Sequence, residues 1–182
     1  MGAPHNPARY GETWPQHRID VCLSELEAIR SFAIVSGGWA WHFMSPKCHV
    51  ELKHAHDHKD IDVFVAPSDV AEVVTILQTR GFEKVWTRYD RLPSNEDFRR
   101  YEKSVACPNA RPVRVTIDFF VRDDVPWRSV DGWRVVEPQY LLSLYSNIHS
   151  SDKCFAVQAA SKLIAKGIDP VGRAELLHRP DK

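Results

Sequence analysis

The segment Asp60-Ile61-Asp62-Val63-Phe64-Val65 constrains the fold of this chain more than any other. Its β-branched and aromatic residues predict a strand over 60–65, closed by Pro67. Successive side chains of a strand point to opposite faces, so Asp60 and Asp62 share one face while the apolar residues share the other. Two carboxylates about 7 Å apart on a rigid strand suit a divalent metal ion held against a phosphate. The segment therefore predicts the outline of a phosphoryl-transfer site.

Size and charge bound the class of protein. The chain has 182 residues and 43% hydrophobic content, most simply one domain with room for a small appendage. Its 24 basic residues balance its 24 acidic ones, so no global charge favours a nucleic-acid or membrane partner. No stretch reaches the ~20 apolar residues of a membrane span, and residues 1–16 lack the apolar run of a signal peptide. The four cysteines form no CxxC pair, which favours free thiols and a soluble, cytoplasmic protein.

Apolar periodicity predicts a mixed α/β region followed by a helical tail. Residues 1–15 are expected to be irregular, 16–137 to form the core, and 138–182 to form a C-terminal helical segment. The expected helices begin at Gln16, with an apolar stripe that reaches Ala33, and continue at 39–44, 68–81 (Ser68 as N-cap), 139–148, 151–166 and 171–178. The expected strands are the end of 32–35, then 60–65, 82–86, 98–106, 112–121 and 133–136, with a hairpin turn at 107–110.

A third carboxylate lies in the predicted strand 112–121. Apolar residues alternate there with more polar ones, and Asp118 is the only acidic residue in the run. Asp60 and Asp62 have a simpler interpretation as the solvated face of an edge strand. Asp is disfavoured in strands, however, and two on one face repel each other, so the pair favours a bound cation.

Together these stretches resemble a known family. Gly37-Gly38-Trp39-Ala40, then His58-x-Asp60-Ile61-Asp62, then Thr116-Ile117-Asp118-Phe119 are similar to the motifs of the nucleotidyltransferase superfamily. The likeness is greatest to its small aminoglycoside and lincosamide nucleotidyltransferases and covers roughly residues 30–165. It implies an α/β (α+β) fold of the polymerase-beta-like type: a small mixed sheet with flanking helices and a helical C-terminal tail.

The resemblance also implies a reaction. A nucleoside monophosphate, with AMP favoured, would pass from an NTP to a hydroxyl of a small-molecule acceptor, with release of pyrophosphate. Asp60 and Asp62 would hold Mg²⁺ or Mn²⁺ at the phosphates, and Asp118 would complete a second metal site or take the proton of the attacking hydroxyl.

The other implied contacts are to the triphosphate. A glycine turn that opens a helix offers backbone N–H groups and a positive dipole end, so Ser36, Gly37 and Gly38 would bind phosphate. An ordinary helix-initiating turn is the alternative. His58 is expected on the strand face of Asp60, where it would touch a phosphate or orient a carboxylate. Lys153 is preferred to Lys162 as a further phosphate contact, and a solvated surface role remains open for both.

Other functions stay open. A toxin-like nucleotidyltransferase acting on tRNA or protein is one, and a non-catalytic nucleotide-binding module of the same fold is another. The histidine-rich stretch 48–58 also allows a zinc-binding interaction protein, although its spacing lacks a matched ligand pair. Trp39 and Trp41 are expected in the core rather than as a platform for substrate.

Overall fold

The computed structural model describes residues 16–44, 59–87, 90, 97–108, 110–147, 154, 157–158, 160–161 and 164–165. The chain divides into two compact units. We call Trp14–Val35 with His58–Val125 the sheet unit, and Met1–Thr13, Ser36–Asp57 and Pro126–Lys182 together the hairpin unit.

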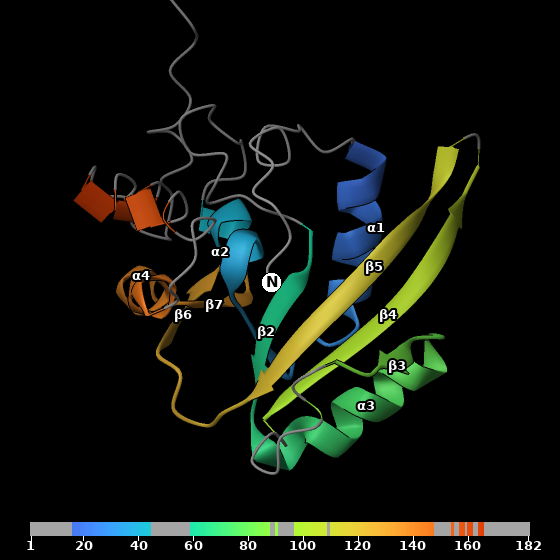
Figure 1. Ribbon diagram of the computed structural model, residues 1–182, viewed down its shortest axis with the longest axis horizontal. Coiled ribbons are helices and arrows are strands. Elements are labelled where there is room, and N and C mark those ends of the chain that lie inside the picture. The colour runs from blue at the N-terminus through green and yellow to red at the C-terminus, as the bar shows by residue number, and fades with distance from the viewer. Residues whose placement is uncertain are drawn as a thin grey trace, which may run out of the picture. The chain divides into compact units, whose positions relative to one another are not determined.

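The sheet unit contains five strands in the order β3-β4-β5-β2-β1 (Figure 1). Its elements are α1 (Gln16–Glu27), β1 (Ala33–Val35), β2 (Ile61–Val65), the 3-10 turn η3 (Pro67–Asp69), α3 (Val70–Thr79), β3 (Glu83–Val85), β4 (Phe98–Cys107) and β5 (Ala110–Val121). The pair β2–β5 is parallel, and the pairs β1–β2, β3–β4 and β4–β5 are antiparallel. The expected α/β class with a small mixed sheet is confirmed.

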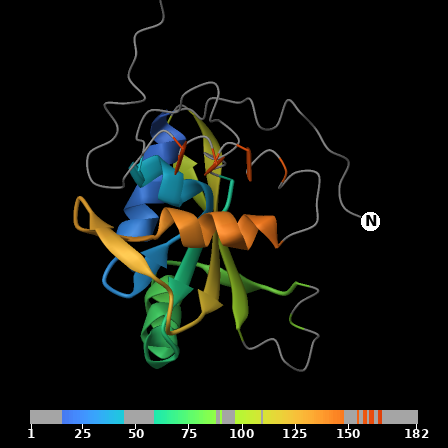
Figure 2. The ribbon, with the colours of Figure 1, turned by 90° about the vertical axis from the view of Figure 1, so that its left-hand side faces the viewer.

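Helices α1 and α3 lie on one side of these strands (Figure 2). Apolar strand side chains that are almost fully buried face them, among them Val115, Ile117 and Phe119 of β5. Cys22, Leu26 and Ile29 from the α1 segment are equally buried, as the apolar stripe predicts. Alternation along the strands therefore leaves Asp62, Arg100, Glu102, Thr116 and Asp118 on the opposite face.

Glycine ends α3 where the sequence places it. Gly81 has φ of 83°, its N–H bonds to the carbonyl of Gln78, and the Phe82 N–H bonds to that of Leu77. This is the Schellman pattern, in which glycine adopts the left-handed conformation after the last helical turn. The start differs from the prediction, because Pro67 opens a 3-10 turn, and Asp69 rather than Ser68 occupies the N-cap of α3.

The hairpin unit contains α2 (Gly37–Met44), β6 (Trp127–Val130), β7 (Trp133–Val136) and α4 (Pro138–Ser146). Strand β6 is missing from the prediction, although its turn has a strong signal. Asp131 and Gly132 join Val130 to its partner Trp133, and both have positive φ, at 49° and 79°. That is the Asp-Gly form of a tight hairpin turn. Phe43 of α2 stacks on Trp133, with ring centroids 4.7 Å apart.

Several predicted boundaries are wrong by one or more residues. Helix α1 ends at Glu27, and a hydrogen-bonded turn carries the apolar stripe on to Ala33. Asp60 lies in a bend just before β2 instead of on the strand. The described residues between 154 and 165 are helical, whereas the predicted helix 171–178 lies outside the described residues. None of the helices in the described ranges has the length and apolar character of a membrane span.

Candidate functional site

Two of the expected carboxylates are brought together by strand register. In the parallel pair β2–β5, Asp62 lies opposite Asp118 and Phe64 lies opposite Phe120. The rings of Phe64 and Phe120 are 5.7 Å apart, as side chains on the same face of adjacent strands must be. Asp62 and Asp118 therefore share the face opposite the helices.

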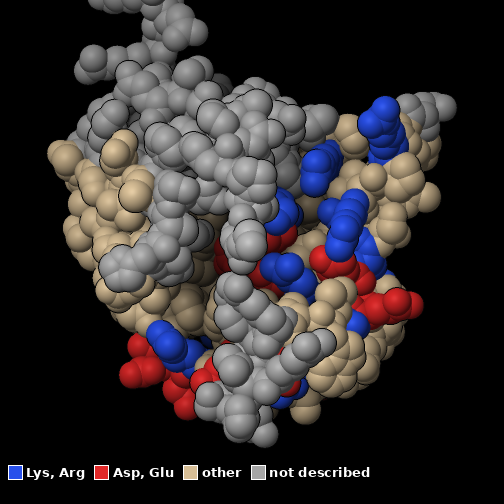
Figure 3. All heavy atoms as spheres, in the orientation of Figure 1, with Lys and Arg blue, Asp and Glu red and all other residues tan. Residues whose placement is uncertain are grey.

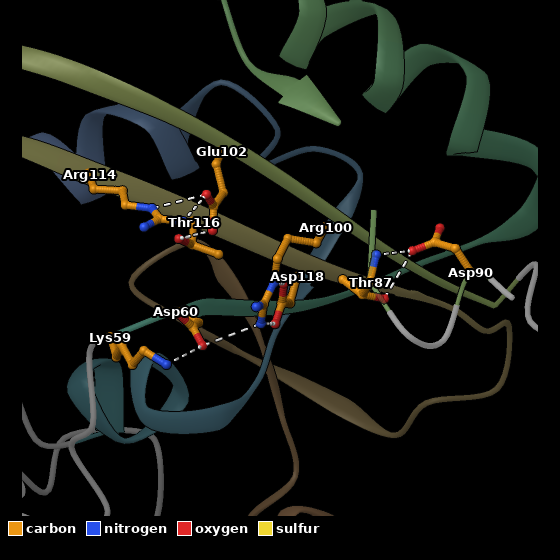
Figure 4. Close-up of polar contacts among 9 residues, drawn as sticks. All are labelled: Lys59, Asp60, Thr87, Asp90, Arg100, Glu102, Arg114, Thr116 and Asp118. Carbon is orange, nitrogen blue, oxygen red and sulfur yellow. Dashed lines mark hydrogen bonds and ion pairs between the residues drawn. The ribbon is translucent and has the colours of Figure 1, made fainter. Parts of the chain in front are cut away.

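An arginine side chain, that of Arg100, links Asp60 to Asp118. In the antiparallel pair β4–β5, Arg100 lies opposite Asp118. Arg100 donates from Nε to Asp118 Oδ1 at 2.7 Å and from Nη2 to Asp118 Oδ2 at 2.6 Å. The same Nη2 is 3.5 Å from Asp60 Oδ2, and Lys59 Nζ is 3.7 Å from that oxygen (Figure 4). One guanidinium thus lies between two of the three predicted carboxylates.

A second charged pair lies beside the Arg100–Asp118 pair, on the same face of the β4–β5 hairpin. Arg114 donates from Nε to Glu102 Oε2 at 3.0 Å and also from Nη2 to the same oxygen. Thr116 donates from Oγ1 to Glu102 Oε1 at 3.2 Å. Figure 4 shows the two pairs side by side on the strands, with Asp60 and Lys59 beyond Asp118.

Burial makes the charge of Asp118 costly. The residue is 5% exposed, and burial raises its pKa against the hydrogen bonds and the charge of Arg100, while neighbouring Asp60 raises it further. The pKa of Arg100 is also raised, chiefly by its hydrogen bonds to Asp118, and this keeps Arg100 protonated. A carboxylate with a perturbed pKa, a specific partner and two acidic neighbours is typical of a functional site.

The donor chemistry fits a hard divalent cation at Asp60 and Asp62. Mg²⁺ is commonly bound by one or two carboxylates together with substrate phosphates. Both oxygens of Asp118, by contrast, accept hydrogen bonds from Arg100. In the described ranges no group of three or more His, Cys, Asp or Glu side chains is placed to hold a metal ion without other ligands. The charge repulsion that predicts a cation is also compensated within the chain, by Lys59 and Arg100.

The predicted phosphate turn belongs to the hairpin unit. Gly37 has φ of 59°, which glycine adopts without strain, and the carbonyl of Ser36 accepts a hydrogen bond from the N–H of Ala40 at 3.1 Å. The chain therefore turns at Ser36-Gly37-Gly38 and opens α2, as predicted. Trp39 and Trp41 are fully buried, which confirms the core assignment.

Other predicted contacts lie outside the described residues: His58, Lys153, Lys162 and the histidine-rich stretch 48–58. Cys22, Cys107 and Cys154, the cysteines in the described ranges, are free.

Sequence reasoning missed Lys59 and Arg100. A signal for Arg100 was present, because Arg100 and Glu102 alternate with Arg99 and Tyr101 in the predicted strand 98–106. A correct hairpin register would have placed Arg100 opposite Asp118. The turn residues 107–110 alone do not define that register, because the hairpin has an irregularity between Val105 and Cys107.

A scan against protein-family models and a search of curated proteins give no match to this chain. Among solved structures, the chain is similar to the lincosamide antibiotic adenylyltransferase LnuA, determined with bound lincomycin. The TM-score is 0.49 at 12% sequence identity, over 84% of this chain and 99% of that chain. The chain is also similar to the antibiotic-resistance factor ANT(2'')-Ia, with a TM-score of 0.47 at 12% identity, over 88% of this chain and 87% of that chain. These structural neighbours are nucleotidyltransferases, the class that the sequence resembles.

Proposed function

We propose that this protein is a nucleotidyltransferase that moves a nucleoside monophosphate, with AMP favoured, from an NTP to a hydroxyl of a small-molecule acceptor. The acceptor oxygen forms a bond to the α-phosphorus, the bond from that phosphorus to the β-phosphate oxygen breaks, and pyrophosphate leaves. One observation carries the proposal: Asp62 lies in register with Asp118, and Asp60 reaches the same guanidinium as Asp118.

The carboxylates have separate tasks in this proposal. Asp60 and Asp62 would hold Mg²⁺ or Mn²⁺, which neutralises phosphate charge and polarises the phosphoryl oxygens when bound. Asp118 is more deeply buried, and we assign it to the attacking hydroxyl, which it would orient and relieve of its proton. Most of the rate enhancement then comes from positioning and fixed charge rather than covalent chemistry.

The triphosphate contacts are proposed from the resemblance and from local structure. Ser36, Gly37 and Gly38 turn the chain into α2, whose first backbone N–H groups suit a phosphate. His58 and Lys153 are proposed as further phosphate contacts, at the positions that the motif implies.

Charge matching on the sheet supports a small acceptor over tRNA. Lys and Arg side chains are interleaved with Asp and Glu side chains over β4 and β5 (Figure 3). Arg100 of β4 and Arg114 of β5 are each paired with a carboxylate. A surface that neutralises many phosphates needs unpaired cations, so a nucleic-acid acceptor is not favoured.

A thermal-shift titration tests the donor site. Each of the four NTPs is added with and without Mg²⁺ to the native protein, to Asp62→Asn and to the control Asp123→Asn, which changes an exposed aspartate beyond β5. A ligand that binds only the folded state raises stability by RT ln(1 + [L]/Kd), so nucleotide at about 100 Kd gives a clear shift.

We expect a Mg²⁺-dependent shift that the control keeps and Asp62→Asn loses. Release of pyrophosphate during a screen of hydroxyl acceptors would then identify the second substrate. No shift with any NTP, alone or together with the acceptor pool, would contradict the proposal.

A further inference from the structure

Arg100 occupies the place between two carboxylates that the proposed function assigns to different tasks. Its guanidinium uses both oxygens of Asp118 and reaches Asp60 with the nitrogen that contacts Asp118 Oδ2. Its positive charge therefore lies where the three carboxylates concentrate negative charge. A divalent cation held by Asp60 and Asp62 would be repelled by this positive charge.

The geometry also allows Arg100 to leave. Its side chain is 28% exposed, whereas that of Asp118 is 7% exposed. Arg100 extends from β4, so rotation about its side-chain bonds would free Asp118 without moving the backbone of β2 or β5. The carboxylates are fixed by strand register, and the guanidinium is the adjustable member of the cluster.

Electrostatics gives the direction of the effect. Two positive charges near the same carboxylates repel one another, strongly where the site is buried and less where water reaches them. A bound cation and a paired Arg100 therefore oppose one another. Without the cation, Arg100 compensates the buried Asp118, which otherwise has no equivalent partner among the contacts described above.

We propose that Arg100 is an internal counter-cation of the site, which holds Asp118 when no metal ion is bound and competes with the divalent cation for the carboxylates. Arg100 is thus a positioning residue that weakens metal binding until a nucleotide brings additional phosphate ligands. This inference rests on the proposed function, because it takes Asp60 and Asp62 as the carboxylates that bind the cation.

Direct binding of Mn²⁺, followed by the electron paramagnetic resonance signal of the free ion, tests the competition without any turnover. The full chain is titrated with Mn²⁺ alone, as the native protein and as Arg100→Gln, Arg100→Lys and Arg114→Gln. Arg114→Gln is the matched control, because Arg114 makes the same kind of pair across the same two strands but lies four residues from Asp118, about 13 Å along β5.

Competition predicts that Arg100→Gln binds Mn²⁺ at least about tenfold more tightly than the native protein. Arg100→Lys keeps the positive charge but loses the bidentate hydrogen bonds to Asp118. Its affinity for Mn²⁺ should therefore fall between those of the native protein and Arg100→Gln. Arg114→Gln binds as the native protein does.

If the native protein binds Mn²⁺ as tightly as both Arg100 variants, or more tightly, the competition is overturned, whereas the proposed function still stands. If Arg100→Gln does not fold, Arg100→Lys decides, with tighter binding supporting the competition and equal or weaker binding overturning it. Absence of Mn²⁺ binding in every folded variant, with or without ATP, would overturn both proposals. Tight Mn²⁺ binding by Arg100→Gln without any nucleotide effect would support the competition and contradict the proposed function.

Discussion

Asp62 of β2 and Asp118 of β5 lie directly opposite one another in a parallel strand pair. Neighbouring strands are about 4.8 Å apart, so the two carboxylates start from backbone positions that already force them together. A shift of one residue in either strand would send one of them to the helix-covered face. The cluster is therefore fixed by the pairing of the sheet and does not depend on the conformation of a loop.

Replacement of either register partner tests whether the cluster is catalytic. Asp62→Asn and Asp118→Asn are each expected to lower acceptor-dependent pyrophosphate release by at least about 100-fold, because an amide neither binds a divalent cation well nor takes a proton. Circular dichroism and the midpoint of thermal unfolding check that both variants fold. Activity within a few-fold of native in folded Asp118→Asn would show that this carboxylate is structural.

Unfolding measurements should show that Arg100 and Asp118 do not contribute equally to stability. Arg100→Gln leaves a buried carboxylate without its cation and is expected to lower the free energy of unfolding at pH 7 by about 3 kcal/mol. Asp118→Asn loses the pair but also removes the cost of burying a charge, so its effect should stay within about 1 kcal/mol. Urea unfolding of both variants gives the comparison.

The sign of the pH effect follows from the raised pKa of Asp118. A carboxyl group whose pKa is higher in the folded state than in the unfolded state favours folding as pH falls, because the folded state then binds the extra proton. The difference in the free energy of unfolding between the native protein and Arg100→Gln should therefore shrink as the pH is lowered from 7 toward the ordinary range of carboxyl pKa values. A deficit that grows on acidification would show that Asp118 is not the group left without a partner.

The amino-acid pattern was enough for the strands of the site but not for their pairing. Alternation around Asp62 and Asp118 predicted that each would lie on the more polar face of its strand, since side-chain direction along a strand is a local property. The same alternation does not apply to Asp60, which lies in the bend before β2. Which strands are neighbours, and in what register, is decided by long-range packing that no local pattern encodes. Arg100 was missed for that reason, because only the β4–β5 register places it against Asp118.

Local chemistry explains the other successes and failures. Gly81 was predicted correctly as the end of α3, because left-handed backbone favours glycine wherever a helix ends in this way. The strand β6 was missed because Trp127–Val130 is too short to show alternation, while the signal lay in the turn that follows, Asp131-Gly132.

The backbone at Gly81 gives a clean measurement of conformational strain. A Cβ built at this residue would meet nothing within 4 Å, so Gly81→Ala adds no clash, and its cost comes from φ of 83° alone. We expect a loss of about 1 kcal/mol in the free energy of unfolding, and a smaller loss for Gly81→Asn, since Asn tolerates this conformation better. Equal stability of Gly81→Ala and the native protein would mean that the helix end rearranges.

Glu25 is the buried charge that joins α1 to the rest of the sheet unit. Its carboxylate is 2.8 Å from Arg80 Nε and 2.6 Å from Lys103 Nζ, on the helix-covered face away from Asp118. Burial opposes its ionisation, but hydrogen bonds from Arg80 and Lys103 outweigh burial and hold its pKa below the ordinary value of 4.5. The stability that Glu25 contributes is therefore complete above that value and is lost as the pH falls through the lowered pKa.

Replacement of Glu25 should consequently change both the size and the pH dependence of stability. Glu25→Gln is expected to lose about 2 kcal/mol at pH 7, less than a fully buried pair would, because Arg80 is 36% exposed. The matched control is Glu27→Gln, which breaks an exposed pair with Arg30 one helical turn away and should cost less than about 0.5 kcal/mol. Urea unfolding at pH 7 and at pH 3 measures both, and the difference between native protein and Glu25→Gln should narrow at the lower pH. A difference that stays constant across this range would mean that Glu25 acts through its shape and neutral hydrogen bonds, not through its charge.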